Sequence, residues 1–406
     1  MEQNDHNAAL NDHKELGRIL GLFSFNRKVP GTVYWWPKGA LLFDTIVNDL
    51  KKELIIQGYQ DLKTAPIIDL DTLKASGHYD NYREKLFFTG NEKEMKDNKV
   101  NWCLKPMSCP GGIKIFNEQM HSYKDLPIKY SEMGTVFRYE QPGEVNGLLR
   151  TRVMTQDDAH IYCHEDQIED ELIKLIKFVN LHYQKFGFKD IRVELSTRPE
   201  KSIGTDAEWQ KAENGLIQAL KDADISYKEN KGDGAFYGPK IDFHVKDAQD
   251  RSWQMGTIQL DFATAERLDA CYIDASGSKK HPVIIHRAIL GSVERFIAVL
   301  LESTGGALPV WLSPIQVIIL PVSEKHNKYA KEVNDKLSDD SIRVEIDERN
   351  ESVSKKIRDA EIQKVPYIIV VGDKEIADNN LSVRSRGLKE LKNQNLKEFL
   401  DQILKL

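Results

Sequence analysis

The sequence of 406 residues lacks several features that would assign it to a class directly. No run approaches ~18 apolar residues, so we expect no membrane-spanning helix. The polar, acidic N-terminus has no apolar core, so we expect no signal peptide and a cytoplasmic location. No GxxxxGK[ST] motif is present, which excludes a P-loop nucleotide site on motif evidence. The four cysteines form no CxxC pair, so they are interpreted as free thiols or metal ligands rather than a disulfide framework.

An excess of charge of one sign is also missing. Basic and acidic residues number 57 and 63, and the formal net charge is −6. Composition therefore gives no indication of a nucleic-acid partner, which would have to be recognised by local sites. The length allows two to three domains with real cores.

Hydrophobic patterning predicts the main elements. An amphipathic helix is expected over 38–59, ended by Gly58, followed by a strand over 60–70 that Pro66 interrupts. Two charged strands, TVFRYE (135–140) and LLRTRVMTQ (148–156), are expected to form a hairpin. A strand ending at His286 should precede a helix that begins near Ala288. Gly-rich turns and alternating runs over 232–262 predict antiparallel strands.

The segment STGGALP (303–309) is the best candidate for a linker. Beyond it, short apolar runs alternate with helical stretches, which predicts a compact α/β domain with a mainly parallel sheet. We therefore expect a first domain over 1–303, a linker over 304–310 and a second domain over 311–406.

Two sets of residues could carry chemistry. Cys109, His160 and His286 offer one thiolate and two imidazoles, a set that leaves Zn²⁺ an open position. Such scattered residues are more often packed bystanders, so spacing alone makes this a weak prediction. A second set, made of arginines, could clamp a triphosphate, although surface ion pairing is the common alternative. Its members are Arg138, Arg150 and Arg295.

Five strings in this order resemble the threonyl-tRNA synthetases, which are class II aminoacyl-tRNA synthetases: CLKPMSCPG, TQDDAHIYC, GAFYGPKIDF, WQMGTIQLDF and HRAILGS. The resemblance covers nearly the whole chain, as a catalytic core plus an anticodon-binding domain. It implies an α+β catalytic domain with an antiparallel sheet, followed by an α/β anticodon-binding domain. The three class motifs correspond to the helix and strand over 38–66, Arg138-Tyr-Glu140 with its loop, and Gly291-Ser-Val-Glu-Arg295-Phe.

The resemblance also implies roles for residues. One Zn²⁺ per subunit would be held by Cys109, His160 and His286 and would bind the threonine amino and hydroxyl groups. Threonine would further contact Met107, Gln156, Asp158 and Tyr237. ATP, with Mg²⁺, would contact Arg138, Glu140, Arg150, Met154, Gln254, Gln259, Ser292 and Arg295. Catalytic roles are expected for Arg138, Arg295 and His78, the last as a proton shuttle with a pKa near ~6.5. The anticodon would be read by Asn350, Lys364, Glu375 and Arg384.

The reaction implied is activation of threonine by ATP and transfer of the threonyl group to the 3′ end of tRNA(Thr). The homodimer would form through residues 38–66. A site built to bind a hydroxyl group discriminates against valine by a factor of roughly 10⁴ or more. Serine keeps the hydroxyl group and lacks only a methyl group, so discrimination against it is limited to about 1–3 kcal/mol. Relatives commonly carry N-terminal domains, one of which hydrolyses seryl-tRNA. The sequence contains no candidate for it, so we expect no editing of seryl-tRNA by this chain.

The chain departs from the family pattern at three positions. Gly112 follows CPG where a histidine is common, Met154 stands where an aromatic ring stacks on adenine, and Lys364 stands where arginine is usual. These departures predict weaker ATP binding and a less strict reading of the anticodon. They leave two alternatives open: an RNA-binding paralogue that does not charge tRNA, and an enzyme that activates threonine for another acceptor.

Overall fold

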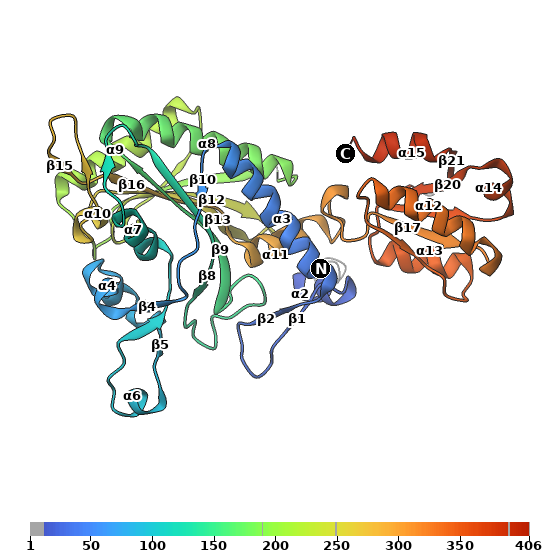
Figure 1. Ribbon diagram of the computed structural model, residues 1–406, viewed down its shortest axis with the longest axis horizontal. Coiled ribbons are helices and arrows are strands. Elements are labelled where there is room, and N and C mark those ends of the chain that lie inside the picture. The colour runs from blue at the N-terminus through green and yellow to red at the C-terminus, as the bar shows by residue number, and fades with distance from the viewer. Residues whose placement is uncertain (1–11, 189, 248–249, 389, 406) are drawn as a thin grey trace. The chain divides into compact units, whose positions relative to one another are not determined.

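The computed structural model describes residues 12–188, 190–247, 250–388 and 390–405 (Figure 1). The chain divides into two compact units. The first contains the described residues of 1–24, 34–46 and 300–406, and the second contains residues 25–33 and 47–299. Two helices, α3 (Pro37–Ile56) and α11 (Val293–Thr304), contribute residues to both. No helix among the described residues is both long and apolar enough to cross a membrane.

The second unit is built on an eight-stranded sheet with the order β11-β10-β12-β13-β16-β9-β8-β3. Pairing is antiparallel from β10 to β8, and only the two outermost pairs are parallel. The predicted antiparallel sheet is therefore confirmed. The strands are β3 (Gln60–Asp61), β8 (Ile128–Phe137), β9 (Val153–Cys163), β10 (Ile191–Ser196), β11 (Lys228–Asn230), β12 (Lys240–Lys246), β13 (Ser252–Asp261) and β16 (Val283–Ser292).

Two long helices, α8 (Ile168–Lys185) and α9 (Asp206–Asp222), pack on this sheet against β13 (Figure 1). An acidic first turn favours the start of α8, and Gly187 follows its end with φ +89°. A capping box between Thr205 and Glu208 begins α9.

Smaller elements surround the sheet. Short strands form three further sheets: β1 (Phe23–Phe25) with β2 (Val33–Trp35); β4 (Ile67–Asp69), β6 (Trp102–Leu104) and β5 (Phe87–Thr89); and β15 (Lys279–Lys280), β14 (Tyr272–Ile273) and β7 (His121–Ser122). Short helices occupy the connections: α4 (Leu70–Ala75), α5 (His78–Tyr82), α6 (Glu92–Lys96), α7 (Cys109–Asn117) and α10 (Thr264–Arg267).

Three predicted boundaries are wrong. The charged hairpin pairs 128–137 with 153–163, so most of its charges lie in the connecting loop, where Arg150 and Glu140 pair with each other. Pro66 does not interrupt one strand but separates β3 from β4, which belong to different sheets. The strand through His286 continues to Ser292, because Ala288 still pairs with Asp158 of β9. It ends beyond Gly291, whose φ is +71°, and α11 begins at Val293.

The C-terminal part of the first unit holds a five-stranded sheet with the order β18-β17-β19-β20-β21. Its strands are β17 (Val317–Pro321), β18 (Val344–Ile346), β19 (Tyr367–Val371), β20 (Leu381–Ser385) and β21 (Lys392–Gln394). Pairs around β17 are parallel and the pairs of β20 are antiparallel. The sheet is therefore mixed, and the prediction of a mainly parallel sheet is half right.

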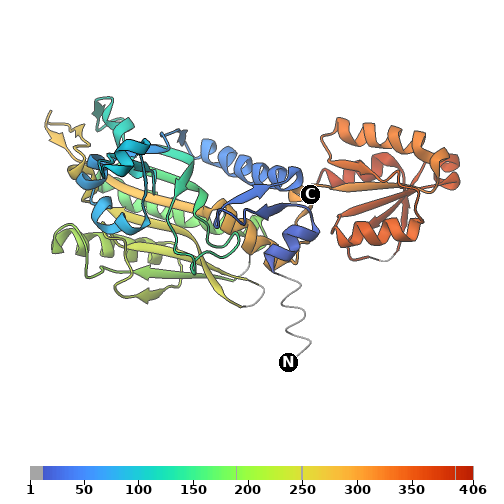
Figure 2. The same cartoon turned by 90° about the horizontal axis from the view of Figure 1, so that it is seen from below.

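Helices cover both faces of this sheet (Figure 2). They are α12 (Asn327–Asp339), α13 (Val353–Ile362), α14 (Asp373–Asp378) and α15 (Leu396–Ile403), and the chain enters the unit through α2 (His13–Ile19). The side chains of Val317 and Ile319 pack with α12 and α15, while Ile318 and Leu320 pack with α13. This alternation along β17 follows from the two-residue period of a strand, and it explains why the strand is apolar throughout. The sequence also predicts a short polar helix over residues 1–18; α2 lies largely within that range, and residues 1–11 lie outside the described residues.

Candidate active site

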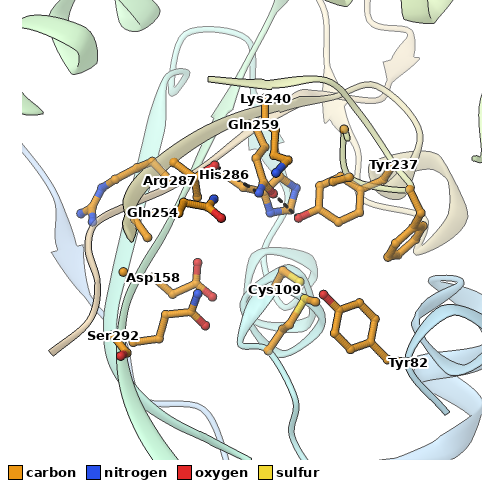
Figure 3. A pocket seen from close by; sticks show the side chains of 18 of the residues that line it. Tyr82, Cys109, Asp158, Tyr237, Lys240, Gln254, Gln259, His286, Arg287 and Ser292 are labelled. Carbon is orange, nitrogen blue, oxygen red and sulfur yellow. Dashed lines mark hydrogen bonds between the residues drawn. The ribbon is translucent and has the colours of Figure 1, made fainter. Parts of the chain in front are cut away.

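A cleft of about 480 Å³ opens on the eight-stranded sheet of the second unit (Figure 3). Alternate residues of β9 point toward it, because Met154, Gln156 and Asp158 are two positions apart. Neighbouring strands add side chains at matching register; Gln259 of β13 pairs with His286 of β16. The cleft brings together most of the residues predicted from sequence: Met107, Cys109, Arg138, Met154, Gln156, Asp158, Tyr237, Gln254, Gln259, His286, Ser292 and Arg295.

The three predicted metal ligands form one buried cluster. The ligand atoms of Cys109, His160 and His286 all lie within 4.8 Å of one another. The histidines are directly paired across β9 and β16, and their ring centroids are 4.9 Å apart. Cys109 begins α7 and reaches the cluster from outside the sheet. A thiolate with two imidazoles is a donor set that suits Zn²⁺.

Two further observations fit a metal. The Nε2 atom of His160 is buried and has no hydrogen-bond partner. The Nε2 atom of His286 lies 3.1 Å from Asp261 Oδ2, the kind of carboxylate partner that orients a metal-binding histidine. Burial raises the pKa of the Cys109 thiol well above its usual value. The thiolate therefore needs a cation beside it, which a bound metal would supply.

Polar groups beside this cluster are available to a ligand. Asp158 is buried, which raises the pKa of its carboxyl group, and it accepts only a long hydrogen bond of 3.4 Å from Ser108 N. Gln156 Oε1 is buried without a partner. Tyr237 donates its hydroxyl to Gln259 Oε1, and its ring lies 4.8 Å from the ring of His286 (Figure 3). Unsatisfied buried polar atoms are costly, so their concentration here indicates a polar ligand.

Two arginines provide positive charge on another side of the cleft. Arg295 donates from Nε to Leu149 O and from Nη1 to Gln254 O, both at 2.9 Å. Arg138 donates from Nε to Pro106 O at 3.1 Å. Burial, followed by the charges of Arg138 and Arg150, lowers the pKa of Arg295 to about 10, so it remains charged near neutral pH. Backbone carbonyls thus fix both guanidinium groups while leaving donors for an anion.

Four predicted site residues do not line the cleft: His78, Glu140, Arg150 and His160. His160 lies behind it, within the metal cluster. Glu140 is buried and accepts hydrogen bonds through Oε2 from Lys85 Nζ at 2.6 Å and Arg150 Nη2 at 3.0 Å. These contacts occupy the charges that were expected to meet ATP, and Lys85, distant in sequence, could not be foreseen as their partner.

The fourth residue, His78, begins α5 and is almost completely buried. Its Nδ1 lies 2.8 Å from Ser76 Oγ, and its Nε2 lies 3.2 Å from Cys109 Sγ. Burial lowers the pKa of His78 to about 3. The expected pKa near 6.5 is therefore wrong, and this imidazole is neutral near neutral pH.

Sequence reasoning missed two groups of the site. Lys240 lines the cleft at the start of β12, where its Nζ lies 2.7 Å from Asp242 Oδ2 and 3.1 Å from Asp233 Oδ2. Asp261 supports His286 and accepts backbone N–H groups from Ala263 and Thr264. Both stand in strings that the sequence displays, GPKIDF and IQLDF. A charged residue at the end of an apolar strand could have identified each of them from the sequence.

The four residues predicted to contact an anticodon all lie in the C-terminal part of the first unit. Asn350 is on an exposed bend after β18, and Lys364 follows α13 with φ +55°. Glu375 accepts Gly372 N and Ser382 Oγ. Arg384, on β20, donates to Leu388 O and pairs with Glu361.

Comparison with known proteins agrees with this architecture. Residues 88–304 match the tRNA synthetase class II core domain (G, H, P, S and T), and residues 316–406 match an anticodon-binding domain. Threonine–tRNA ligases from Caldanaerobacter subterraneus subsp. tengcongensis and Carboxydothermus hydrogenoformans are 46% and 44% identical to it over 98% of this chain. The chain spans 61% and 62% of their lengths.

Among solved structures, the RNA binding domain of threonyl-tRNA synthetase from Cryptosporidium parvum superposes with a TM-score of 0.91. It is 40% identical, and the match covers 97% of this chain and 98% of that one. The core-domain match includes both arginines and every residue that lines the cleft except Asn81 and Tyr82, and the second match spans the five-stranded sheet. The chain belongs to the class II aminoacyl-tRNA synthetases, as a core domain joined to an anticodon-binding domain.

Proposed function

We propose that this protein is a threonine–tRNA ligase. In the first step, threonine and ATP give threonyl-adenylate and pyrophosphate; in the second, the 3′-terminal adenosine of tRNA(Thr) accepts the threonyl group. The observation that carries the proposal is the buried cluster of Cys109, His160 and His286 beside Asp158, in the same cleft as Arg138 and Arg295. Relatives named threonine–tRNA ligase support the same assignment.

Recognition of threonine is assigned to the metal side of the cleft. When bound, Zn²⁺ would supply a Lewis-acid centre for the amino and hydroxyl groups of threonine. Asp158 accepts the hydroxyl proton, and the free Gln156 Oε1 with the Tyr237 hydroxyl orients the amino group. Met107 closes the apolar side. Valine has the same shape but no hydroxyl, so it would leave these buried groups unpaired, a penalty of roughly 10⁴ or more in specificity.

ATP is assigned to the arginine side, with Mg²⁺ on its phosphates. Arg138 holds the α-phosphate and the threonine carboxylate, so that it stabilises the charge that develops as the carboxylate attacks. Arg295 holds the γ-phosphate. Gln254, Gln259, Ser292 and Met154 line the remaining space for the nucleotide. Because both guanidinium groups are already held by carbonyl oxygens, little reorganisation is needed when the substrate binds.

The second step of the reaction transfers the threonyl group to tRNA. His78 remains the candidate for assisting the ribose hydroxyl, now as a neutral imidazole. The C-terminal part of the first unit would bind the anticodon through Asn350, Lys364, Glu375 and Arg384, by contacts to the edges of unstacked bases. A homodimer through residues 38–66 completes the proposal.

Two assays and one metal measurement test this function. We expect threonine-dependent exchange between ATP and pyrophosphate, threonyl-tRNA formation, and one Zn²⁺ per chain. Cys109→Ser should lose both the metal and the exchange, whereas Cys271→Ser, a cysteine outside the cluster, should keep both. Zinc-loaded protein without exchange would overturn the proposal in favour of an RNA-binding paralogue. Exchange without charging of tRNA would point to another acceptor.

Serine is the expected error of this site. It keeps the hydroxyl group and loses one methyl, which limits discrimination to about 1–3 kcal/mol. We propose that this polypeptide, supplied with serine, accumulates seryl-tRNA. Efficient deacylation of seryl-tRNA by the purified chain would contradict this.

A further inference from the structure

Gly112, a buried residue without a side chain, lies beside the metal-binding residue His160. Gly112 belongs to α7, and a Cβ atom built on it would meet two heavy atoms outside its helix within 4 Å. These are His160 Nδ1 at 3.5 Å and Tyr162 Oη at 3.6 Å. Both neighbours are polar, and both belong to residues that are at least nine-tenths buried.

Each of the two polar atoms needs a hydrogen-bond partner. Tyr162 is fully buried with its ring stacked on Phe116, and its hydroxyl has no partner. The opposite ring nitrogen of His160, Nε2, lies 3.7 Å from Asp158 Oδ1 and is the nitrogen available to a metal. Nδ1 then carries the proton, and it must donate that proton to an acceptor.

The two metal-binding histidines differ in this respect. His286 has its acceptor, because the carboxylate of Asp261 lies 3.1 Å from its Nε2. Within the described part of the chain, no group forms a hydrogen bond with His160 Nδ1. Metal-binding histidines almost always give their second N–H to a carboxylate, a carbonyl or a water molecule. Since Gly112 removes the side chain that could fill the space, water is the remaining partner.

We propose that one ordered water molecule is bound beside Gly112, where it accepts the Nδ1 proton of His160, bonds to the Tyr162 hydroxyl, and so fixes the tautomer of this zinc ligand. The site takes a neutral donor–acceptor ligand, since a buried water is held by two to four polar partners. Glycine at position 112 is then a requirement of the site, because any larger apolar side chain would expel the water. The inference rests on the zinc site proposed above.

Three substitutions separate this role from a merely structural one. Gly112→Ala places a methyl group in ordinary contact with both polar atoms and leaves them unpaired. It should not unfold the protein, since Gly112 has no positive φ and alanine favours a helix by about 1 kcal/mol. Gly112→Ser puts a hydroxyl group where the water would be. Tyr162→Phe removes one partner of the water, and Gly143→Ala is a matched control whose new methyl group meets nothing within 4 Å.

The first readout is the rate at which zinc-loaded protein releases zinc to a chromogenic chelator. Gly112→Ala should release it about 10- to 100-fold faster than wild type, the usual effect of losing such a partner. Gly112→Ser should stay close to wild type, Tyr162→Phe should fall between them, and Gly143→Ala should not change. Equal rates for wild type and Gly112→Ala, or equally fast release from the alanine and serine variants, would overturn the inference.

The second readout is a crystal structure, which decides the matter even without zinc. Wild-type protein that binds no zinc would refute the proposed metal site, yet the water can still be sought in its electron density. Density within hydrogen-bond distance of both His160 Nδ1 and Tyr162 Oη supports the inference, and its loss is expected in Gly112→Ala. An empty space in the wild type would overturn the inference while leaving the proposed function standing.

Discussion

Two regions of the molecule treat buried polar groups in opposite ways. In the unit with the cleft, several buried side chains keep an atom without a partner, among them Ser108, Gln156 and His160. In the C-terminal part, no described residue does so. Its buried polar side chains have partners instead: Asp347 pairs with Arg349, and His326 pairs with Asp373.

The contrast separates a site from a scaffold. Unpartnered buried atoms cost stability, and a fold retains them where a ligand completes their hydrogen bonds. Buried polar groups that already have partners, such as Asp347, need no ligand. The cleft is therefore prepared for a small polar ligand, whereas the C-terminal surface is suited to a large partner that adds its own groups. Four predictions test this difference.

The largest effect is expected when an arginine of the cleft is removed, with an arginine of the C-terminal part as the control. Arg138→Ala should lower threonine-dependent ATP–pyrophosphate exchange about 10²- to 10³-fold, because a charge-stabilising donor is lost from the reacting centre. Arg349→Ala is the matched control; its guanidinium pairs with Asp347 and Asp359 in the other region, and exchange needs no anticodon. Steady-state kinetics measure both, and comparable losses in the two variants would break the comparison.

The next effect concerns how the free energy of unfolding depends on pH. Burial raises the pKa of Glu294 from 4.5 to about 7, although Thr155 N donates to both of its oxygens. The folded state therefore binds the proton more tightly than the unfolded state, and stability falls as pH rises from 4.5 to 7, by roughly 3 kcal/mol. Glu294→Gln should remove this decline, which urea unfolding across that pH range measures.

Asp347 should give the opposite sign. Hydrogen bonds from Arg349 lower the pKa of its carboxyl group below 3.8. Its contribution is therefore present above pH 3.8 and is lost as pH falls below that value, so Asp347→Asn should flatten the acid limb of the same unfolding curves. If Glu294→Gln and Asp347→Asn change the slope of stability against pH in the same direction, the two regions do not differ as described.

A third test exchanges Lys364 for arginine. The backbone carbonyl of Lys364 accepts Arg386 Nη1 at 2.9 Å, and the substitution leaves that bond in place. Arginine offers a planar fork that can contact a base edge twice, so discrimination between tRNA(Thr) and a tRNA with an altered anticodon should rise by about 1–3 kcal/mol. Charging kinetics with the two tRNAs measure it, while pyrophosphate exchange should stay constant. Unchanged discrimination would remove Lys364 from the anticodon surface.

Parts of both regions could be predicted from the sequence, for physical reasons. The family resemblance assigned Met154, Gln156 and Asp158 to one site, and the structure places them two positions apart on one face of β9. The register of β9 with β16, known only from the structure, pairs His160 with His286. The C-terminal core was equally readable, because continuous apolar runs such as Tyr367–Val371 are typical of strands covered on both faces.

What the sequence could not predict depends on distant packing. The lowered pKa of His78 follows from its burial and then from the charge of His286. Phe236, whose ring centroid is 5.3 Å away, and Cys109 contact His78, and none of these residues is near it in sequence. Glu140 is paired by Lys85 across 55 residues. The end of β16 depends on Gly291, whose Cβ would lie 2.2 Å from Met255 O on the neighbouring strand. Local patterns contain none of these contacts.

The smallest expected effect is at Met154, in the strand that bears the residues proposed to bind threonine. Its flexible side chain can cover a ring face, but it lacks the fixed plane of an aromatic residue. Met154→Phe should therefore lower the dissociation constant for ATP about 2- to 10-fold, equivalent to roughly 0.5–1.5 kcal/mol of ring stacking. Equilibrium binding of ATP measures the change. Threonine binding, which we assign to Gln156 and Asp158 further along β9, should not respond. If wild type binds ATP as tightly as Met154→Phe, methionine already covers the adenine fully. The cleft would then be as rigid on its nucleotide side as on its metal side.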